Sequence, residues 1–253
     1  MLETYIKDRL AEKQILLMTH IVVGYPSFED SLRMVEAMVE GGVDLMELQI
    51  PFSEPIADGP VILHANQEAL ASGTTVARCL DFAREVTARF DIPFLFMTYY
   101  NILYQYGVAE FASQMAERGV KGAIVPDLPP EEGKGYLAAM AQEGLSPIFI
   151  FSPATSRKRM DYIASFAKGF VYCVARKGVT GQETAFSLEL DEYLDRCRQA
   201  TTLPLALGFG VKGREDIDFL TGKADIAVIG TQTIRLVEEQ GVDAVKGFIE
   251  GLT

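Results

Sequence analysis

The chain has 253 residues, of which 49% are hydrophobic and 23% charged, and acidic residues outnumber basic ones by 35 to 23. This composition is ordinary for a chain that buries a large core, and it excludes disordered, collagenous and coiled-coil proteins. The formal charge of −12 repels nucleic acid and anionic membrane surfaces, so we expect neither as a partner.

The first residues and the cysteines bear on the cellular compartment of the protein. The opening segment MLETYIKDRLAEKQ is charged and amphipathic, which predicts no signal peptide. The longest apolar runs, such as IPFLFM, are shorter than the ~20 residues of a membrane-spanning helix. Cys79, Cys173 and Cys197 are widely spaced, which predicts neither a disulfide framework nor a metal site. We therefore expect a cytoplasmic protein that holds no metal.

Short β-rich runs alternate with helical patterns along the whole chain. After a first helix at 2–12, the expected strands cover residues 16–23, 44–50, 93–98, 122–126, 146–151, 169–174, 204–208 and 224–229. The expected helices between them cover residues 27–41, 75–90, 108–118, 131–143, 155–167, 188–199 and 213–221. Eight such units in ~250 residues predict one α/β domain over 1–253, a (β/α)8 TIM barrel, with the first helix closing its bottom.

The second expected strand and the loop after it carry two carboxylates. The segment reads ELQIPFSEPIADGP, with Glu47 inside the apolar strand and Asp58 eleven residues later. Burial disfavours the charged form of a carboxylate, so a group placed like Glu47 can exchange protons near neutral pH. Two carboxylates in different surroundings at one barrel mouth can divide acid and base roles. The alternative is that Glu47 is a satisfied buried acid and that Asp58 caps a helix at 60–72.

Glycines follow the last two strands, where barrels of this kind bind phosphate. Gly208 and Gly210 flank Phe209 after the seventh strand, and Gly230 and Thr231 follow the eighth, before a helical stretch to residue 237. Glycines let the backbone approach an anion closely, and N–H groups at a helix start point toward it. The alternative is that these are ordinary turn glycines.

Several of these segments resemble one known family. ELQIPFSEPIADGP resembles the signature of the tryptophan synthase α subunit family, the indole-3-glycerol-phosphate lyases. The likeness continues in the same order through MTYYN, IVPDLPPEE, ARKGVTG, LGFGV and VIGTQ, and it covers nearly the whole chain. The resemblance implies a retro-aldol cleavage of indole-3-glycerol phosphate to indole and glyceraldehyde 3-phosphate, a step of tryptophan biosynthesis.

The resemblance also implies roles for individual residues and a partner. Glu47 falls on the acid–base that acts at the indole carbon, and Asp58 falls on the group that hydrogen-bonds the indole N–H. Gly181 joins the phosphate-binding positions, while Tyr99 and Phe209 fall on the substrate pocket. The implied partner is a β subunit in an α2β2-type heterotetramer. Pyridoxal phosphate is expected in that β subunit, and no cofactor is expected in this chain.

The sequence departs from the family pattern at five positions near the expected site. His20, Val22 and Tyr25 stand where the family has an aromatic residue, a threonine and an aspartate, and Gln49 replaces a glycine. Thr231 replaces the usual serine and keeps the hydroxyl. Residues 47 and 49 of a strand point to the same face, so Gln49 is expected inside the barrel beside Glu47. There it either hydrogen-bonds Glu47 or narrows the indole pocket. His20 is expected to point inward too, either as a satisfied core histidine or as a partner of the Gln49 change.

These departures leave two further functions open. One is a diverged paralogue that keeps the acid pair and the phosphate site but acts on another phosphorylated small molecule. The other is a partner protein that senses a phosphorylated ligand and regulates another subunit without catalysis. The carboxylate inside a strand argues against the second, because a sensor has no need of a buried acid.

Overall fold

The structure is a computed structural model of the chain, and it describes residues 1–175, 183–208 and 210–252, with only the backbone described at 183–188. Its eight parallel strands form a closed barrel in which each strand pairs with the next and β8 pairs with β1. They are β1 Leu16–Val22, β2 Leu45–Gln49, β3 Phe94–Met97, β4 Gly122–Ile124, β5 Ser146–Phe151, β6 Val171–Val174, β7 Leu205–Gly208 and β8 Ile226–Ile229. The (β/α)8 fold expected from the sequence is confirmed.

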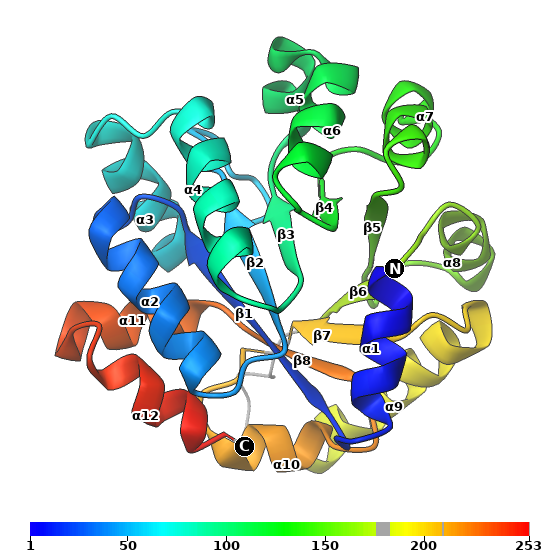
Figure 1. Cartoon of the computed structure of the whole chain (residues 1–253). Helices are drawn as coiled ribbons and strands as arrows, with labels where there is room; N and C mark the ends of the chain where they lie inside the picture. Colours follow the sequence, from blue (N-terminus) through cyan, green and yellow to red (C-terminus); the bar gives the residue numbers. More distant parts are fainter. Residues whose placement is uncertain (176–182, 209, 253) are drawn as a thin grey trace.

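Helices surround the strands on the outside of the barrel (Figure 1). In chain order they are α1 Leu2–Leu10, α2 Phe28–Glu40, α3 Pro60–Ala71, α4 Val76–Arg89, α5 Tyr100–Tyr106, α6 Val108–Glu117, α7 Lys134–Gln142, α8 Arg157–Ala164, α9 Glu183–Ala200, α10 Arg214–Leu220, α11 Thr231–Gln240 and α12 Ala244–Glu250. Two of them, α5 and α12, were not expected. Both have seven residues, too few to show an amphipathic period. Among the described residues, no helix is both long and apolar enough to cross a membrane.

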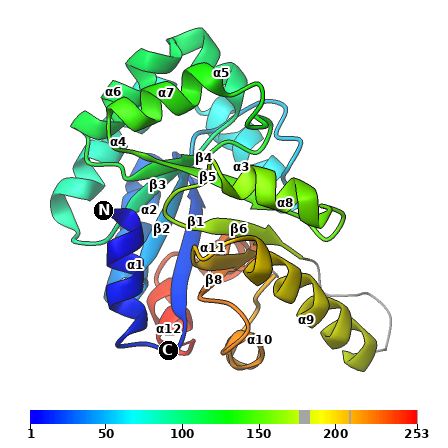
Figure 2. The ribbon, with the colours of Figure 1, turned by 90° about the vertical axis from the view of Figure 1, so that its right-hand side faces the viewer.

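The helix α1 closes one end of the barrel, as expected. Leu2 and Ile6 are buried in the inner core together with residues of several strands, among them Leu16 and Leu45. The strand residues in this contact lie at the amino ends of β1 and β2, and Figure 2 shows α1 packed against one end of the barrel. The opposite, carboxyl end of the barrel is therefore the end left free for a binding site.

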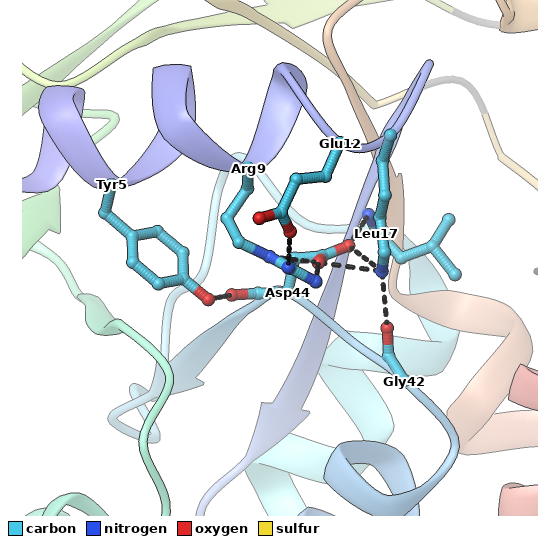
Figure 3. A network of polar contacts seen from close by, with 7 residues as sticks. Tyr5, Arg9, Glu12, Leu17, Gly42 and Asp44 are labelled. Atoms are coloured by element: carbon cyan, nitrogen blue, oxygen red, sulfur yellow. Dashed lines mark hydrogen bonds and ion pairs between the residues drawn. The ribbon is translucent and has the colours of Figure 1, made fainter.

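Asp44, directly before β2, ties α1 to the strands (Figure 3). Its carboxylate is 1% exposed and accepts hydrogen bonds from the backbone N–H of Leu17 at 3.0 Å, from Lys13 Nζ at 2.8 Å and from Arg9 Nη2 at 3.0 Å. The Tyr5 hydroxyl donates to the Asp44 carbonyl at 3.1 Å. Every oxygen of this buried carboxylate has a partner, which is the usual condition for burying a charge.

Candidate active site

A cavity of about 350 Å³ opens at the carboxyl end of the barrel. Glu47 and Asp58 both line it, although they are separated by the loop from β2 to α3. The residues after β7 and β8 form another part of its wall, including Gly208, Gly210, Gly230 and Thr231. The structure thus brings the two carboxylates and the glycine-rich turns, both identified from the sequence, around one space.

Glu47 points into the barrel and has one partner. Strand register places it opposite His20 of β1, and its Oε2 lies 3.0 Å from His20 Nδ1. The two side chains are almost fully buried, with 2% of Glu47 and 4% of His20 exposed. The second carboxylate oxygen, Oε1, is buried without a hydrogen-bond partner, and so is His20 Nε2. Glu47 is therefore not the fully satisfied buried acid of the alternative interpretation.

The electrostatics of His20 follow from this contact. Burial lowers the pKa of His20 because it disfavours the imidazolium. The hydrogen bond to Glu47 and the negative charges of Glu47 and Asp58 outweigh burial, so the pKa of His20 is raised above its usual value. A histidine whose raised pKa favours its imidazolium form thus lies beside the expected acid–base group.

Asp58 is held by side chains and does not cap a helix. The N-cap of α3 is Gly59, and no side chain caps it, so the capping alternative is wrong. The Asp58 Oδ2 atom instead accepts hydrogen bonds from Gln49 Nε2 at 2.7 Å and from the Tyr99 hydroxyl at 3.1 Å. Burial and the charge of Asp58 raise the pKa of Tyr99, which keeps this hydroxyl protonated as a donor.

Gln49 and Tyr99 hold Asp58 in place without lining the cavity themselves. Both were expected to line the pocket, but they are fully buried and contact Asp58 outside the cavity lining. Gln49 was expected to bind Glu47 or to narrow the pocket; its amide binds Asp58 instead. The reason is that the β2–α3 loop folds back over the strand end, where the Tyr99 hydroxyl also accepts from the backbone N–H of Ala57 at 3.1 Å.

The sequence analysis missed Asn66, which completes this support. Asn66 is fully buried in α3, and its Oδ1 accepts from the backbone N–H of Phe52 at 2.9 Å and lies 3.4 Å from Gln49 Nε2. Its Nδ2 donates to the Ile62 carbonyl at 2.8 Å. A signal existed, because Asn66 falls on the same helical face as the buried Ala65 and Ala69, where an apolar residue is expected.

The glycine-rich turns lie where phosphate was expected. Gly208 ends β7, and a Cβ at this position would meet the Tyr172 ring at 3.0 Å, so a larger residue does not fit without a shift. Gly210 has a φ of 82°, which favours glycine. Gly230 is the N-cap of α11 and has no side-chain cap, and Thr231 begins the helix. Gly181 and Phe209 lie outside the described residues.

Two basic residues that the sequence analysis did not single out also line the cavity. Lys212 follows β7, and Arg235 lies on α11 beside the glycine-rich turns. Their positive charges offset the acidic character of the chain locally. Among the described residues, no group of three His, Cys, Asp or Glu side chains is arranged to hold a metal ion.

Val22 and Tyr25, which depart from the family pattern, both contact the helices around the barrel. Val22 is buried with Ala65 and Ile234, which joins β1 to α3 and α11. The Tyr25 hydroxyl donates to Glu238 of α11 at 2.7 Å, and burial together with Glu238 raises the pKa of Tyr25. These two residues therefore hold the helices around the mouth.

Comparisons with known proteins agree with this architecture. The family model described as "Tryptophan synthase alpha chain" matches residues 6–250. The tryptophan synthase alpha chains of Desulforapulum autotrophicum and Syntrophotalea carbinolica are 68% and 64% identical to this chain over 252 residues, with full coverage of both proteins in each case.

A solved tryptophan synthase subunit alpha from Legionella pneumophila is 30% identical, with a TM-score of 0.90 over 99% of this chain and 96% of that chain. A chain of tryptophan synthase from M. tuberculosis in its aminoacrylate-bound form is 28% identical, with a TM-score of 0.90 over 99% of this chain and 97% of that chain. The family assignment made from the sequence motifs is confirmed: the chain belongs to the tryptophan synthase alpha chain family.

Proposed function

We propose that this chain cleaves indole-3-glycerol phosphate to indole and glyceraldehyde 3-phosphate, the lyase reaction that its family membership carries. The observation that supports the proposal most is the placement of Glu47 and Asp58 on one cavity whose other side is formed by glycine-rich turns. An indole ring fits beside the carboxylates while a phosphate lies at the turns. The −12 charge of the chain makes such local anion-binding groups necessary.

Glu47 is the proposed acid–base. A proton passes from Glu47 to the indole carbon that carries the glycerol chain, which makes the ring positively charged. Glu47 then takes the proton of the adjacent glycerol hydroxyl as the carbon–carbon bond breaks, so the enzyme returns to its starting state. The free Oε1 atom supports this role because it has no competing partner.

Asp58 is the proposed stabiliser of the charged ring. Its carboxylate accepts the indole N–H hydrogen bond, which strengthens as positive charge develops on the ring. Gln49 and Tyr99 already hold its Oδ2 atom, so little reorganisation is needed on substrate binding. The phosphate is proposed to bind the backbone around Gly208, Gly210, Gly230 and Thr231, with Gly181 as a further phosphate contact and Phe209 in the substrate pocket.

We further propose a tryptophan synthase β subunit as partner, in an α2β2-type complex, with pyridoxal phosphate bound by that subunit and none by this chain. Exposed apolar residues near the mouth support a docking surface there. Ile56, in the loop that carries Asp58, is 80% exposed, and Tyr104 on α5 is 67% exposed. A cytoplasmic location stays a prediction.

The test is indole release from indole-3-glycerol phosphate by the purified chain, with and without a tryptophan synthase β subunit. We expect release that rises when the β subunit is added. A folded chain that releases no indole under either condition contradicts the proposal and favours the diverged paralogue. Binding to the β subunit without any turnover favours the regulatory role.

A further inference from the structure

The contact between His20 and Glu47 differs from an ordinary buried ion pair. Each side chain uses one polar atom in the 3.0 Å contact, and the other polar atom, Nε2 or Oε1, is buried without a partner. Buried polar atoms are normally satisfied, so a pair with two unpaired atoms calls for an explanation. Both residues line the cavity, which makes these atoms available to a ligand or to water within it.

The backbone around the pair fixes its geometry. β1 and β2 are hydrogen-bonded neighbours, and their register places the two residues directly opposite each other. A Cβ at Gly230 would lie 3.6 Å from the His20 Cβ, so the glycine at the start of α11 leaves the imidazole its space. The Glu47 Oε2 atom is thereby held on the His20 side, and Oε1 is the oxygen left for reaction.

We propose that His20 and Glu47 form a proton-sharing pair, in which His20 positions Glu47 and holds the proton that Glu47 alternately gives and receives. This inference rests on the proposed lyase function and adds a positioning residue to it. His20 does not itself touch the reacting atoms.

The proton balance of the cycle is closed within the pair. In the one-proton form, His20 donates its Nδ1–H to Glu47 Oε2, and the exchangeable proton lies either on Glu47 Oε1 or on His20 Nε2. Glu47 gives it to the indole carbon through Oε1, and the pair regains one proton from the glycerol hydroxyl when the carbon–carbon bond breaks. No oxidant, metal or external base takes part.

The other groups around His20 allow this titration. Asp58 on the β2–α3 loop adds negative charge, which favours the imidazolium. Tyr172 on β6 faces the same cavity, but burial first, and then the charges of Glu47 and Asp58, raise its pKa, so it stays neutral. Lys212 after β7 and Arg235 on α11 are basic side chains that also line the cavity.

The pair predicts a loss of kcat/KM on the basic side of the pH profile. Above the pH at which the pair loses its exchangeable proton, Glu47 has none to give to the indole carbon. Because that proton is shared, this basic side should coincide with the pH at which His20 itself titrates, and removing His20 should move it.

Two substitutions at His20 separate positioning from simple packing. His20→Phe removes the hydrogen bond and the proton, whereas His20→Asn keeps an N–H donor near the place of Nδ1 and removes only the titration. We expect the basic side to move in both variants, and a higher kcat at its plateau for His20→Asn than for His20→Phe. His64→Asn is the matched control, because His64 is the other histidine of the chain and lies on α3 outside the cavity lining.

The control variant also isolates His20 for a measurement without substrate. With His64 replaced, every imidazole resonance in the NMR spectrum belongs to His20. We expect it to titrate above the usual histidine value, and to titrate lower when Glu47→Gln is added. Basic sides that coincide with that of the wild type in both His20 variants overturn the proposal, as does a His20 that titrates at or below the usual value. A wild-type chain that releases no indole contradicts the proposed function, while the NMR titration still decides whether the pair shares a proton.

Discussion

Two buried carboxylates three residues apart, Asp44 directly before β2 and Glu47 at its centre, have opposite surroundings. Asp44, at the closed end, receives hydrogen bonds from a backbone N–H and from two basic side chains. Glu47, at the open end, has a single side-chain partner and one oxygen without any. A buried carboxylate whose oxygens all have hydrogen-bond partners stabilises the fold. A buried carboxylate with an unpaired oxygen keeps a position at which a ligand can bind.

The same contrast appears among the buried side-chain atoms that have no partner. In the described part of the chain, His20 Nε2 and Glu47 Oε1 are the two such atoms that belong to residues lining the cavity. Their unpaired state marks the functional end of the barrel independently of any motif. The four predictions below test the contrast, from the largest expected effect to the smallest.

Replacing Glu47 with Gln is expected to have the largest effect. The substitution keeps the shape of the side chain and removes its exchangeable proton, so indole release should fall by about 10²–10⁴-fold. The measurement is steady-state turnover, with circular dichroism to confirm folding. Glu54→Gln is the matched control, because Glu54 is an exposed glutamate in the loop that follows β2. Near-wild-type turnover of the Glu47 variant would remove it as the acid–base.

Replacing Asp44 with Ala should affect stability and leave catalysis intact. The change leaves the buried N–H of Leu17 unpaired and removes the ion pairs that Arg9 of α1 and Lys13 make with Asp44. Because both basic side chains are about one-third exposed, we expect a loss of about 2–3 kcal/mol in the free energy of unfolding, below the full value of a buried pair.

Urea denaturation measures this loss, and kcat is measured well below the midpoint of thermal unfolding. Asp243→Ala is the control, because this aspartate is 92% exposed in its pair with Arg33 and its loss should cost less than about 1 kcal/mol. If kcat of the folded Asp44 variant fell as strongly as that of Glu47→Gln, the two ends of the barrel would not be functionally distinct.

Replacing Gln49 with Met keeps the side-chain volume and removes the donor to Asp58. We expect kcat/KM to fall by about tenfold, because one hydrogen bond to a charged group is lost. Gln49→Gly should also lower kcat/KM. A lower KM in the glycine variant would instead show that Gln49 crowds the pocket, the interpretation that the sequence alone left open. Tyr99→Phe, which removes the second donor to the same oxygen, should resemble Gln49→Met.

Replacing Thr231 with Ala is expected to have the smallest effect. Loss of one hydroxyl at the start of α11 should raise KM by about threefold to tenfold and leave kcat nearly unchanged, since a neutral hydrogen bond contributes ~0.5–1.5 kcal/mol. Thr231→Ser should restore the wild-type KM. A change confined to kcat would place the phosphate elsewhere.

Local patterns in the sequence were sufficient to predict the barrel, because strand runs and amphipathic helices repeat in order along the chain. The β7 and β8 turns could be located as well, since glycines follow those strands directly. The short helix α5 could not be predicted, because its sequence YNILYQY carries no clear amphipathic period. The role of Asn66 could not be predicted either, because its partners come from a loop 14 residues away and from β2.

The sequence by itself therefore determined the (β/α)8 fold, the family, and Glu47 and Asp58 as the carboxylates to consider. Tertiary structure alone decided which groups hold them: His20 on Glu47, across 27 positions of sequence, and Gln49 and Tyr99 on Asp58. The physical reason is strand register and loop closure. A shift of one residue between β1 and β2 would turn His20 or Glu47 to the other face, and the fold-back of the β2–α3 loop turns Gln49 from a pocket residue into a support for Asp58.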